Sequence, residues 1–440
     1  MTSITIGLTL IAVLFVLVLL GMRIAVALLA VGFAGVWIIR GNFDLAMKLM
    51  SIAAYNGVAN YLFATIPLFV LMGHLVSISN VGKDTFDVAE ALLRRLLGGL
   101  GIATVAANTI FAAVTGVSIA SAAVFTKVAV PEMRRHGYRA SFAAGTVAGS
   151  SVLGMLIPPS LLLIIYGVLA EQSIGRMFIA GLAPGMLLAG GFILAIMAMA
   201  RFTPRFVFTP DHLDRRREIG EPSARMGGGE ILRKLLPIVL LVLFVLGGLY
   251  SGFFTPTEAG GVGAFAALVI ALLRRSLDMR KCWAVLTQTG TISVGILVLL
   301  VAASFYSQML AVAGIPAAIG QFVQGSGLGA TGFLLVYVLL ILLLGMILDS
   351  SSILLIVVPI AAPIAQGLGF DLIHFGIITV IAVEVGLLTP PFGISIFTVH
   401  SALGDGKTRL EAIFAGALPF VGVMLAVLGL VAVFPQLIIR

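Results

Sequence analysis

The sequence predicts an all-α polytopic membrane protein made of two inverted halves, with about ten full spans and two re-entrant helical hairpins. Three observations lead to this fold class. Hydrophobic residues make up 60% of the 440 residues, charged residues make up 10%, and the mean hydropathy is +1.19. Such a composition does not fit a surface that faces water. Apolar runs long enough to cross a bilayer recur along the chain, and glycines and prolines recur between its halves at one fixed offset.

The full spans are predicted from apolar runs that approach or exceed the roughly 20 residues needed to cross a bilayer. The first run, from Ile4 to Leu20, has neither a basic start nor a small-residue cleavage site. We therefore expect a retained span and not a signal peptide. The predicted spans are 4–20, 24–39, 60–79, 142–170, 177–199, 235–253, 257–273, 284–311, 373–401 and 412–438.

Two further apolar stretches, 98–133 and 330–366, are interrupted in their middles by Gly, Ser and Asp. This pattern predicts helical hairpins that enter the membrane and return on the same side. The most polar stretch, Arg201 to Lys234, holds eight basic and five acidic residues, including Arg215, Arg216 and Arg217. We interpret 201–234 as a cytoplasmic linker between an N-terminal half, 1–200 with its hairpin at 98–136, and a C-terminal half, 235–440 with its hairpin at 330–366.

An internal repeat relates the two halves. An offset of 232 residues places Ser118 opposite Ser350 and brings the two interrupted stretches into register. Repeats of this kind are common in membrane transport proteins. The aligned glycines and prolines are Pro131 with Pro363, Gly137 with Gly369, Gly154 with Gly386, and Pro158-Pro159 with Pro390-Pro391.

The charges of the repeat loops indicate that the halves are inverted. The loop from Arg134 to Arg139 is strongly basic, whereas its partner from Gln366 to Asp371 has no Lys or Arg. Because basic loops stay in the cytoplasm, the first hairpin is predicted to open to the cytoplasm and the second to the opposite side. The same rule explains the basic residues behind the net charge of +8, because their clusters between apolar runs set the topology. No nucleic-acid partner is therefore expected.

The paired prolines predict broken helices. Proline has no backbone N–H, so Pro158 would free the carbonyl of Gly154, and Pro390 would free that of Gly386. Unwound carbonyls at mid-membrane depth are suitable ligands for sodium. The hairpin tips add hydroxyls, the Asp349 carboxylate and a helix N-terminus that can attract an anion. Glu384 is a second deep acid, and such buried acids are functional candidates.

Other chemistry is disfavoured. Lys127 lies one turn before Pro131 near the predicted cytoplasmic mouth, where a snorkelling side chain is expected. The segment from Ser401 to Thr408 has letters similar to a phosphate loop but no preceding strand, so ATP binding is not expected. A single cysteine, Cys282, excludes an internal disulfide framework.

The segments 115–167 and 345–398 resemble the two signatures of the DctM-like large membrane subunit of tripartite ATP-independent periplasmic (TRAP) transporters. The strings GMLIPPS and GLLTPPF at the two breaks and GMILDSSS at the second hairpin tip carry the resemblance, together with TPTEAG at 255–260. Two positions depart from the family pattern: Arg23 stands in place of a proline, and Ala382 stands where asparagine is expected.

The resemblance implies a sodium-driven elevator-type importer, multi-pass in a bacterial inner membrane. Its implied partners are a small four-span membrane subunit and a periplasmic binding protein that delivers an organic acid, such as a C4-dicarboxylate or sialic acid. No catalytic residue is implied. Sodium ligands are expected at the first hairpin tip and break (Ser118, Gly154, Ile157, Pro158) and at the second (Gly345, Asp349, Gly386, Thr389, Phe392), and substrate contacts at Gly116, Ser118, Ser121, Ser350 and Thr389.

Two alternatives stay open. The first is a self-sufficient sodium-coupled carboxylate or ion carrier with a similar inverted hairpin fold. The second is an intramembrane enzyme that uses Asp349 and Glu384 as an acid pair. Against the enzyme, one acid lies at a hairpin tip and the other inside the following helix, with no repeated acid motif.

Overall fold

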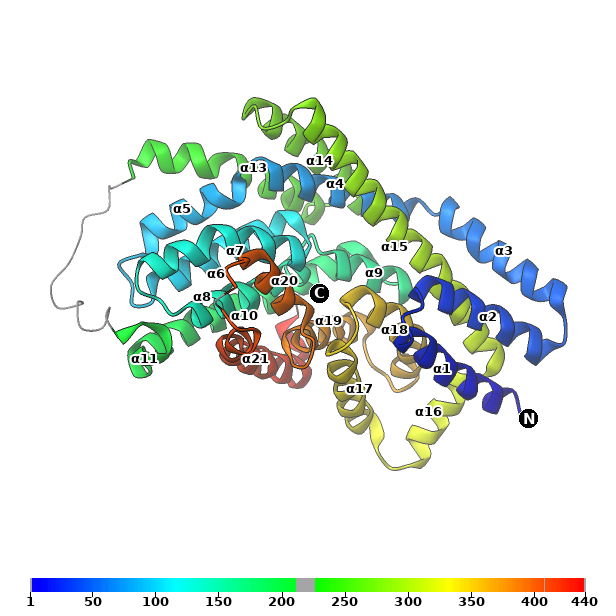
Figure 1. The fold of residues 1–440 in the computed structure, drawn as a ribbon. Helices are drawn as coiled ribbons and strands as arrows, with labels where there is room; N and C mark the ends of the chain where they lie inside the picture. The colour runs from blue at the N-terminus through cyan, green and yellow to red at the C-terminus, as the bar shows by residue number, and fades with distance from the viewer. Residues whose placement is uncertain (1, 211–225, 407, 439–440) are drawn as a thin grey trace.

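The computed structural model describes residues 2–210, 226–406 and 408–438. Within these ranges the chain is helical, and the only extended pairing is an isolated bridge between Tyr138 and Phe208. The first half contains α1 (Ser3–Leu19), α2 (Ile24–Arg40), α3 (Phe43–Ala59), η1 (Tyr61–Ala64), α4 (Thr65–Ile78), α5 (Val81–Leu93), α6 (Gly99–Thr115), α7 (Ser118–Arg135), α8 (Ala140–Ser151), η2 (Val152–Met155), α9 (Leu161–Leu169), α10 (Ile174–Phe202) and α11 (Pro204–Val207) (Figure 1). The second half contains α13 (Gly228–Tyr250), α14 (Pro256–Leu273), α15 (Met279–Ala313), α16 (Ile315–Gly325), α17 (Gly329–Gly345), α18 (Ser350–Gly367), α19 (Leu372–Leu388), α20 (Ile394–Leu403), α21 (Leu410–Val433) and η3 (Pro435–Leu437).

The predicted membrane class and hairpins are confirmed. Seven helices within the described ranges are long and apolar enough to cross a membrane, and further apolar helices are shorter. The two interrupted stretches form the helix–turn–helix pairs α6–α7 and α17–α18. The long runs 142–170 and 373–401 are each broken into two helices, α8 and α9 or α19 and α20, with cis Pro158-Pro159 and cis Pro390-Pro391 at the breaks.

The repeat extends over more of the chain than the sequence comparison indicated. A shift of 232 residues carries both ends of α7 onto the ends of α18, and it carries α2 onto α14 to within one residue. The three helices α3, α5 and α16 were not predicted. They are 17, 13 and 11 residues long, and a search for apolar runs of about 20 residues passes over segments that are shorter or less apolar.

Described helices include residues at both ends of the predicted linker 201–234. Helix α10 continues to Phe202, α11 follows, and α13 begins at Gly228. The rings of Tyr138 and Phe208 pack at an angle of 58° with centroids 4.7 Å apart, which holds the start of the linker against the loop after α7. Arg215, Arg216 and Arg217 lie outside the described residues.

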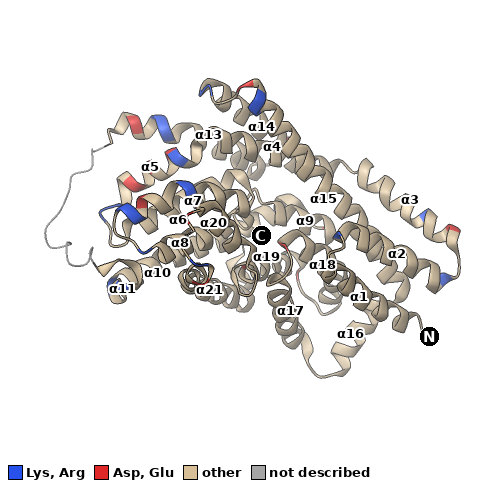
Figure 2. Cartoon of the chain, in the orientation of Figure 1, with Lys and Arg blue, Asp and Glu red and all other residues tan. Residues whose placement is uncertain are grey.

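The helices pack in two groups. Helices α1–α4 pack with α13–α15, whereas the hairpins and broken helices pack with α10 and α21 (Figure 1). Helix α5 joins them: it contacts α13 in the first group and α6 and α7 in the second. Its acids pair with the first group, Asp84 with Arg274 and Asp87 with Lys234, whose Nζ lies 2.8 Å from the carboxylate. Figure 2 shows that charged residues are frequent along the ribbon at the end formed by α5, α7 and α13.

Candidate functional site

The first hairpin tip lies directly on the first helix break. Helix α6 ends at Gly116, whose φ of 62° favours glycine. The Leu161 N–H donates to the Gly116 carbonyl over 3.2 Å. A Cβ added to Gly116 would lie 2.5 Å from the carbonyl oxygen of Pro159. The absence of a side chain therefore lets the backbone of the hairpin approach the backbone of the break.

The first break leaves unpaired oxygens where sodium ligands were predicted. The N–H groups of Leu156 and Ile157 both donate to Leu153, and none of the hydrogen bonds recorded for the described residues reaches the Gly154 carbonyl, as expected from Pro158. The Ser118 hydroxyl is buried and has no hydrogen-bond partner. A Cβ on Gly154 would lie 3.5 Å from the Ser118 nitrogen, so tip and break are neighbours. Buried, unpaired oxygens are costly unless a ligand satisfies them.

The second hairpin tip contacts the second break through two glycines. A Cβ on Gly345 would lie 2.7 Å from the Cα of Gly386, and a Cβ on Gly386 would lie 2.7 Å from the Cα of Gly345. Asp349 caps α18, because its carboxylate accepts from the Ser352 N–H over 3.2 Å and also from the Ser352 hydroxyl. The tip is therefore held both by helix capping and by close backbone packing.

The prediction of a freed Gly386 carbonyl is wrong. The Thr389 N–H donates to this carbonyl over 3.0 Å, in place of the N–H that Pro390 lacks. The Thr389 hydroxyl donates to the Val385 carbonyl over 2.7 Å, which leaves the hydroxyl oxygen able to accept or to coordinate. Ser350 is buried at the start of α18, and Phe392 is 54% exposed beside the break. The two breaks thus differ in whether the carbonyl four residues before the first proline of the pair is hydrogen-bonded.

A buried polar chain crosses the first hairpin. The Ser121 hydroxyl donates to Asn108 Oδ1 over 2.6 Å, and Asn108 Nδ2 donates to the Ser150 hydroxyl over 2.5 Å. The chain joins α6, α7 and α8. Sequence reasoning missed Asn108, although an amide inside an apolar helix is a recognised interhelical contact. The repeat-equivalent positions are the apolar residues Leu340, Ile353 and Ala382, so the two hairpins differ in polarity.

The two deep acids do not form a hydrogen-bonded pair. Asp349 is engaged with Ser352, whereas Glu384 is 2% exposed and neither of its oxygens has a hydrogen-bond partner. The geometry therefore lacks the shared proton or short contact that an acid dyad requires. The phosphate-loop letters likewise follow the helix α20 and not a strand; Lys407 within them lies outside the described residues.

One cavity lies where the two halves meet, between α7 and α20. It has a volume of about 640 Å³ and is bordered by the second hairpin tip at Ile347. A second cavity of about 390 Å³ shares Lys127 and Ala402 with it and ends at Arg134 and Asp405. The predicted substrate residues Gly116, Ser118, Ser121, Ser350 and Thr389 are not among the lining residues of either cavity. The first cavity is lined by Ala123, Lys127, Ile347, Phe392, Ile394, Phe397, Thr398, Ser401 and Ala402.

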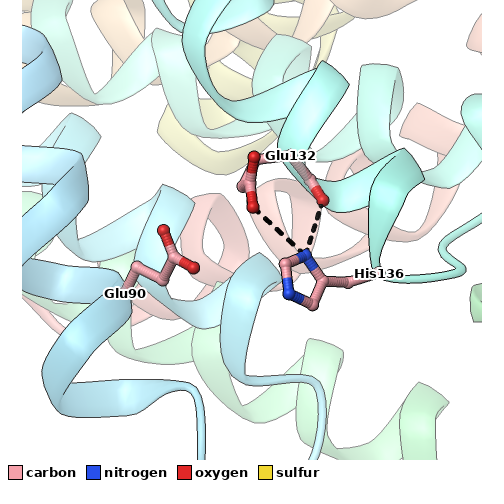
Figure 3. Close-up of side chains that lie close together, drawn as sticks. All are labelled: Glu90, Glu132 and His136. Atoms are coloured by element: carbon pink, nitrogen blue, oxygen red, sulfur yellow. Dashed lines mark hydrogen bonds and ion pairs between the residues drawn. The ribbon is translucent and has the colours of Figure 1, made fainter. Parts of the chain in front are cut away.

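One cluster of metal-ligating side chains lies outside the two breaks. Glu90 on α5 faces Glu132 and His136 at the end of α7, with one ligand atom of each within 4.8 Å of the others (Figure 3). His136 Nδ1 lies 3.4 Å from the Glu132 carboxylate and 3.0 Å from its carbonyl. Burial and the nearby Glu132 raise the pKa of Glu90. The two acids Glu90 and Glu132 therefore lie close together where α5 meets the first hairpin.

Two hairpin tips packed on two broken helices, in a chain of repeated apolar helices, define a polytopic membrane protein of the inverted-repeat transporter class. Residues 11–437 match the family described as tripartite ATP-independent periplasmic transporter, DctM component. The chain belongs to this family, which confirms the resemblance found in the sequence.

Relatives of known name agree with this assignment. The chain is 35% identical over 391 residues to the C4-dicarboxylate TRAP transporter large permease protein DctM of Pseudomonas aeruginosa, covering 89% of this chain and 88% of that protein. It is 30% identical to the sialic acid TRAP transporter large permease protein SiaM of Vibrio cholerae, covering 87% and 86%. The Alcanivorax borkumensis YdaH transporter has a similar fold, with a TM-score of 0.59 at 14% identity over 90% of both chains.

Proposed function

We propose that this chain is the large membrane subunit of a sodium-coupled importer for a small organic acid in a bacterial inner membrane. Its partners would be a small four-span membrane subunit and a periplasmic binding protein. The observation that carries the proposal is the packing of both hairpin tips on repeat-equivalent helix breaks, in a chain that belongs to the DctM family.

Sodium coupling is supported by the chemistry of the first tip and break. Sodium is a hard cation that takes oxygen ligands. Gly154 and Ser118 lie on neighbouring segments, and among the described residues neither the Gly154 carbonyl nor the Ser118 hydroxyl has a hydrogen-bond partner. At the second site the Thr389 hydroxyl oxygen is the counterpart. Inward movement of one positive charge at 100 mV supplies about 2.3 kcal/mol, and the sodium concentration gradient adds to it.

An elevator movement is supported by the two packing groups. The hairpins and broken helices would move as one body against α1–α4 and α13–α15, with α5 as a connecting arm. The acids of α5 pair with the stationary group through Arg274 and Lys234. In this proposal α5 stays attached to the stationary group through these ion pairs while the hairpin group moves.

Reconstitution tests the proposal. Proteoliposomes that hold this chain and its small subunit should import the acid carried by the ligand-loaded binding protein when sodium is outside and the interior is negative. No ATP should be needed. Thr389→Val keeps the side-chain shape but removes an oxygen, so it should raise the sodium concentration needed for half-maximal uptake. Uptake that ignores sodium would contradict the coupling.

Omitting the binding protein separates this proposal from a self-sufficient carrier. In the proposed mechanism, uptake should stop without the binding protein even at high free substrate. Robust transport by the chain alone would favour the self-sufficient carrier, and a requirement for ATP would reject both.

A further inference from the structure

Two neighbouring cavities share Lys127, and among the described residues that line them it is the one whose charge is not compensated. Arg134 is the other cation of the described lining, and its guanidinium lies 2.8 Å from the Asp405 carboxylate. Lys127 has no hydrogen bond or ion pair among the described residues. The lining as described therefore carries one net positive charge, and that charge lies on the residue that the two cavities share on α7.

The position of this charge is not a requirement of the fold. The repeat-equivalent residue is Pro359 on α18, so the second hairpin arm packs without a lysine. Lys127 lies on the cavity side of α7, whereas Phe125 and Ala129 of the same turns are buried and line neither cavity. The helix thus packs through its apolar and small residues, and the lysine is left to face the cavity.

The surroundings of Lys127 suit a carboxylate. Phe392 and Phe397 form apolar walls. Walls of low dielectric constant strengthen the attraction between a charged side chain and an ion of opposite charge. Ser401 offers a hydroxyl that makes no hydrogen bond among the described residues, whereas the Thr398 hydroxyl already donates to the Ile394 carbonyl over 2.9 Å. An ammonium and a hydroxyl donor in one partly apolar cavity form a typical binding arrangement for a small organic anion.

We infer that Lys127 binds the carboxylate of the transported acid in the cavity between α7 and α20. This inference rests on the proposed function, because it names the residue that would recognise the proposed class of substrate. It also changes where the acid is expected to sit: beside the second tip and α20, and not among the buried hydroxyls of the hairpin interiors.

The experiment measures the cavity charge with a reporter thiol. Ala402 lines both cavities, so Ala402→Cys in a Cys282→Ser background places one thiol there. Labelling rates are measured in detergent with an anionic and a cationic methanethiosulfonate of similar size. K127Q should lower the ratio of anionic to cationic rates by about fivefold, the change expected for removal of one charge several ångströms away in a wet cavity. K127R should keep the ratio.

K83Q is the matched control. Lys83 is exposed on α5 and lines neither cavity, so K83Q removes the same charge from the chain and should leave the ratio unchanged. Succinate and N-acetylneuraminate are then tested as competitors. At least one of them should slow labelling in the Lys127 protein and have no effect in K127Q.

A ratio that K127Q leaves unchanged overturns the inference. So does a lack of protection by both carboxylates, or equal protection with and without Lys127. The measurement uses the purified chain without a sodium gradient, small subunit or binding protein. Its failure is therefore distinct from a failure of sodium-driven uptake in the reconstituted complex.

Discussion

The contact between Gly345 and Gly386 gives the most direct test of how the second tip is held. A Cβ on Gly345 would lie 2.7 Å from the Gly386 Cα and 3.3 Å from the Val383 carbonyl oxygen. Ordinary contact begins at 3.4 Å, so Gly345→Ala must move the tip by about 0.7 Å. The obstructing atoms are backbone, which cannot rotate away as a side chain can. Overpacking of this kind costs about 1–3 kcal/mol.

The assay is the free energy of unfolding, measured by titrating mixed micelles with SDS and following far-UV circular dichroism. Gly290 on α15 is the matched control, since its added Cβ would meet nothing within 4 Å. Gly290→Ala should stabilise the protein by about 0.5–1 kcal/mol because alanine loses less backbone entropy in a helix. Gly345→Ala should instead destabilise it.

The double variant tests the geometry further. Gly386→Ala alone should also destabilise, because its Cβ would lie 2.7 Å from the Gly345 Cα. Once the tip has moved, the second methyl group meets a gap, so the combined cost should be less than the sum. The backbone contact would be refuted if the Gly345→Ala protein were as stable as wild type while the Gly290→Ala protein behaved as expected.

Three further predictions follow from the hairpins and the α5 contact. Asn108→Leu should lower the free energy of unfolding in micelles by about 1–2 kcal/mol, because two interhelical hydrogen bonds are lost; no change would mean that the polar chain is not formed. Glu90→Gln should raise the unfolding midpoint at pH 8, since a carboxyl whose pKa is raised on folding destabilises the folded state when it ionises. That gain should vanish below about pH 4, where the carboxyl is protonated in both states; the same gain at both values would exclude a charge effect. Cysteine in place of Gly137 should react with an impermeant thiol reagent from the cytoplasm, and cysteine in place of Gly369 from the periplasm, in a Cys282→Ser background. Labelling of both from one side would contradict the inverted topology.

Hydropathy and spacing were sufficient for the class and the hairpins, and the resemblance of the signature strings identified the family. An apolar run is a property of consecutive residues, so α1, α2, α10, α14 and α21 were found within a few residues of their ends. The Pro-Pro pairs and the glycines at one offset likewise located both breaks, because proline cannot donate to the helix wherever it lies. These features depend on local chemistry, which the sequence states directly.

Contacts between distant segments were decided only by the tertiary structure. The Gly386 carbonyl is not free, because it accepts a hydrogen bond from the Thr389 N–H. The presence of Pro390 does not determine this backbone geometry. Asn108 forms hydrogen bonds with residues of two other helices. Lys127 lines a cavity together with Ile347 and residues between 392 and 402, which are distant from it in the sequence. Hydropathy records how apolar a segment is, whereas the partner of each polar group depends on which helices pack beside it.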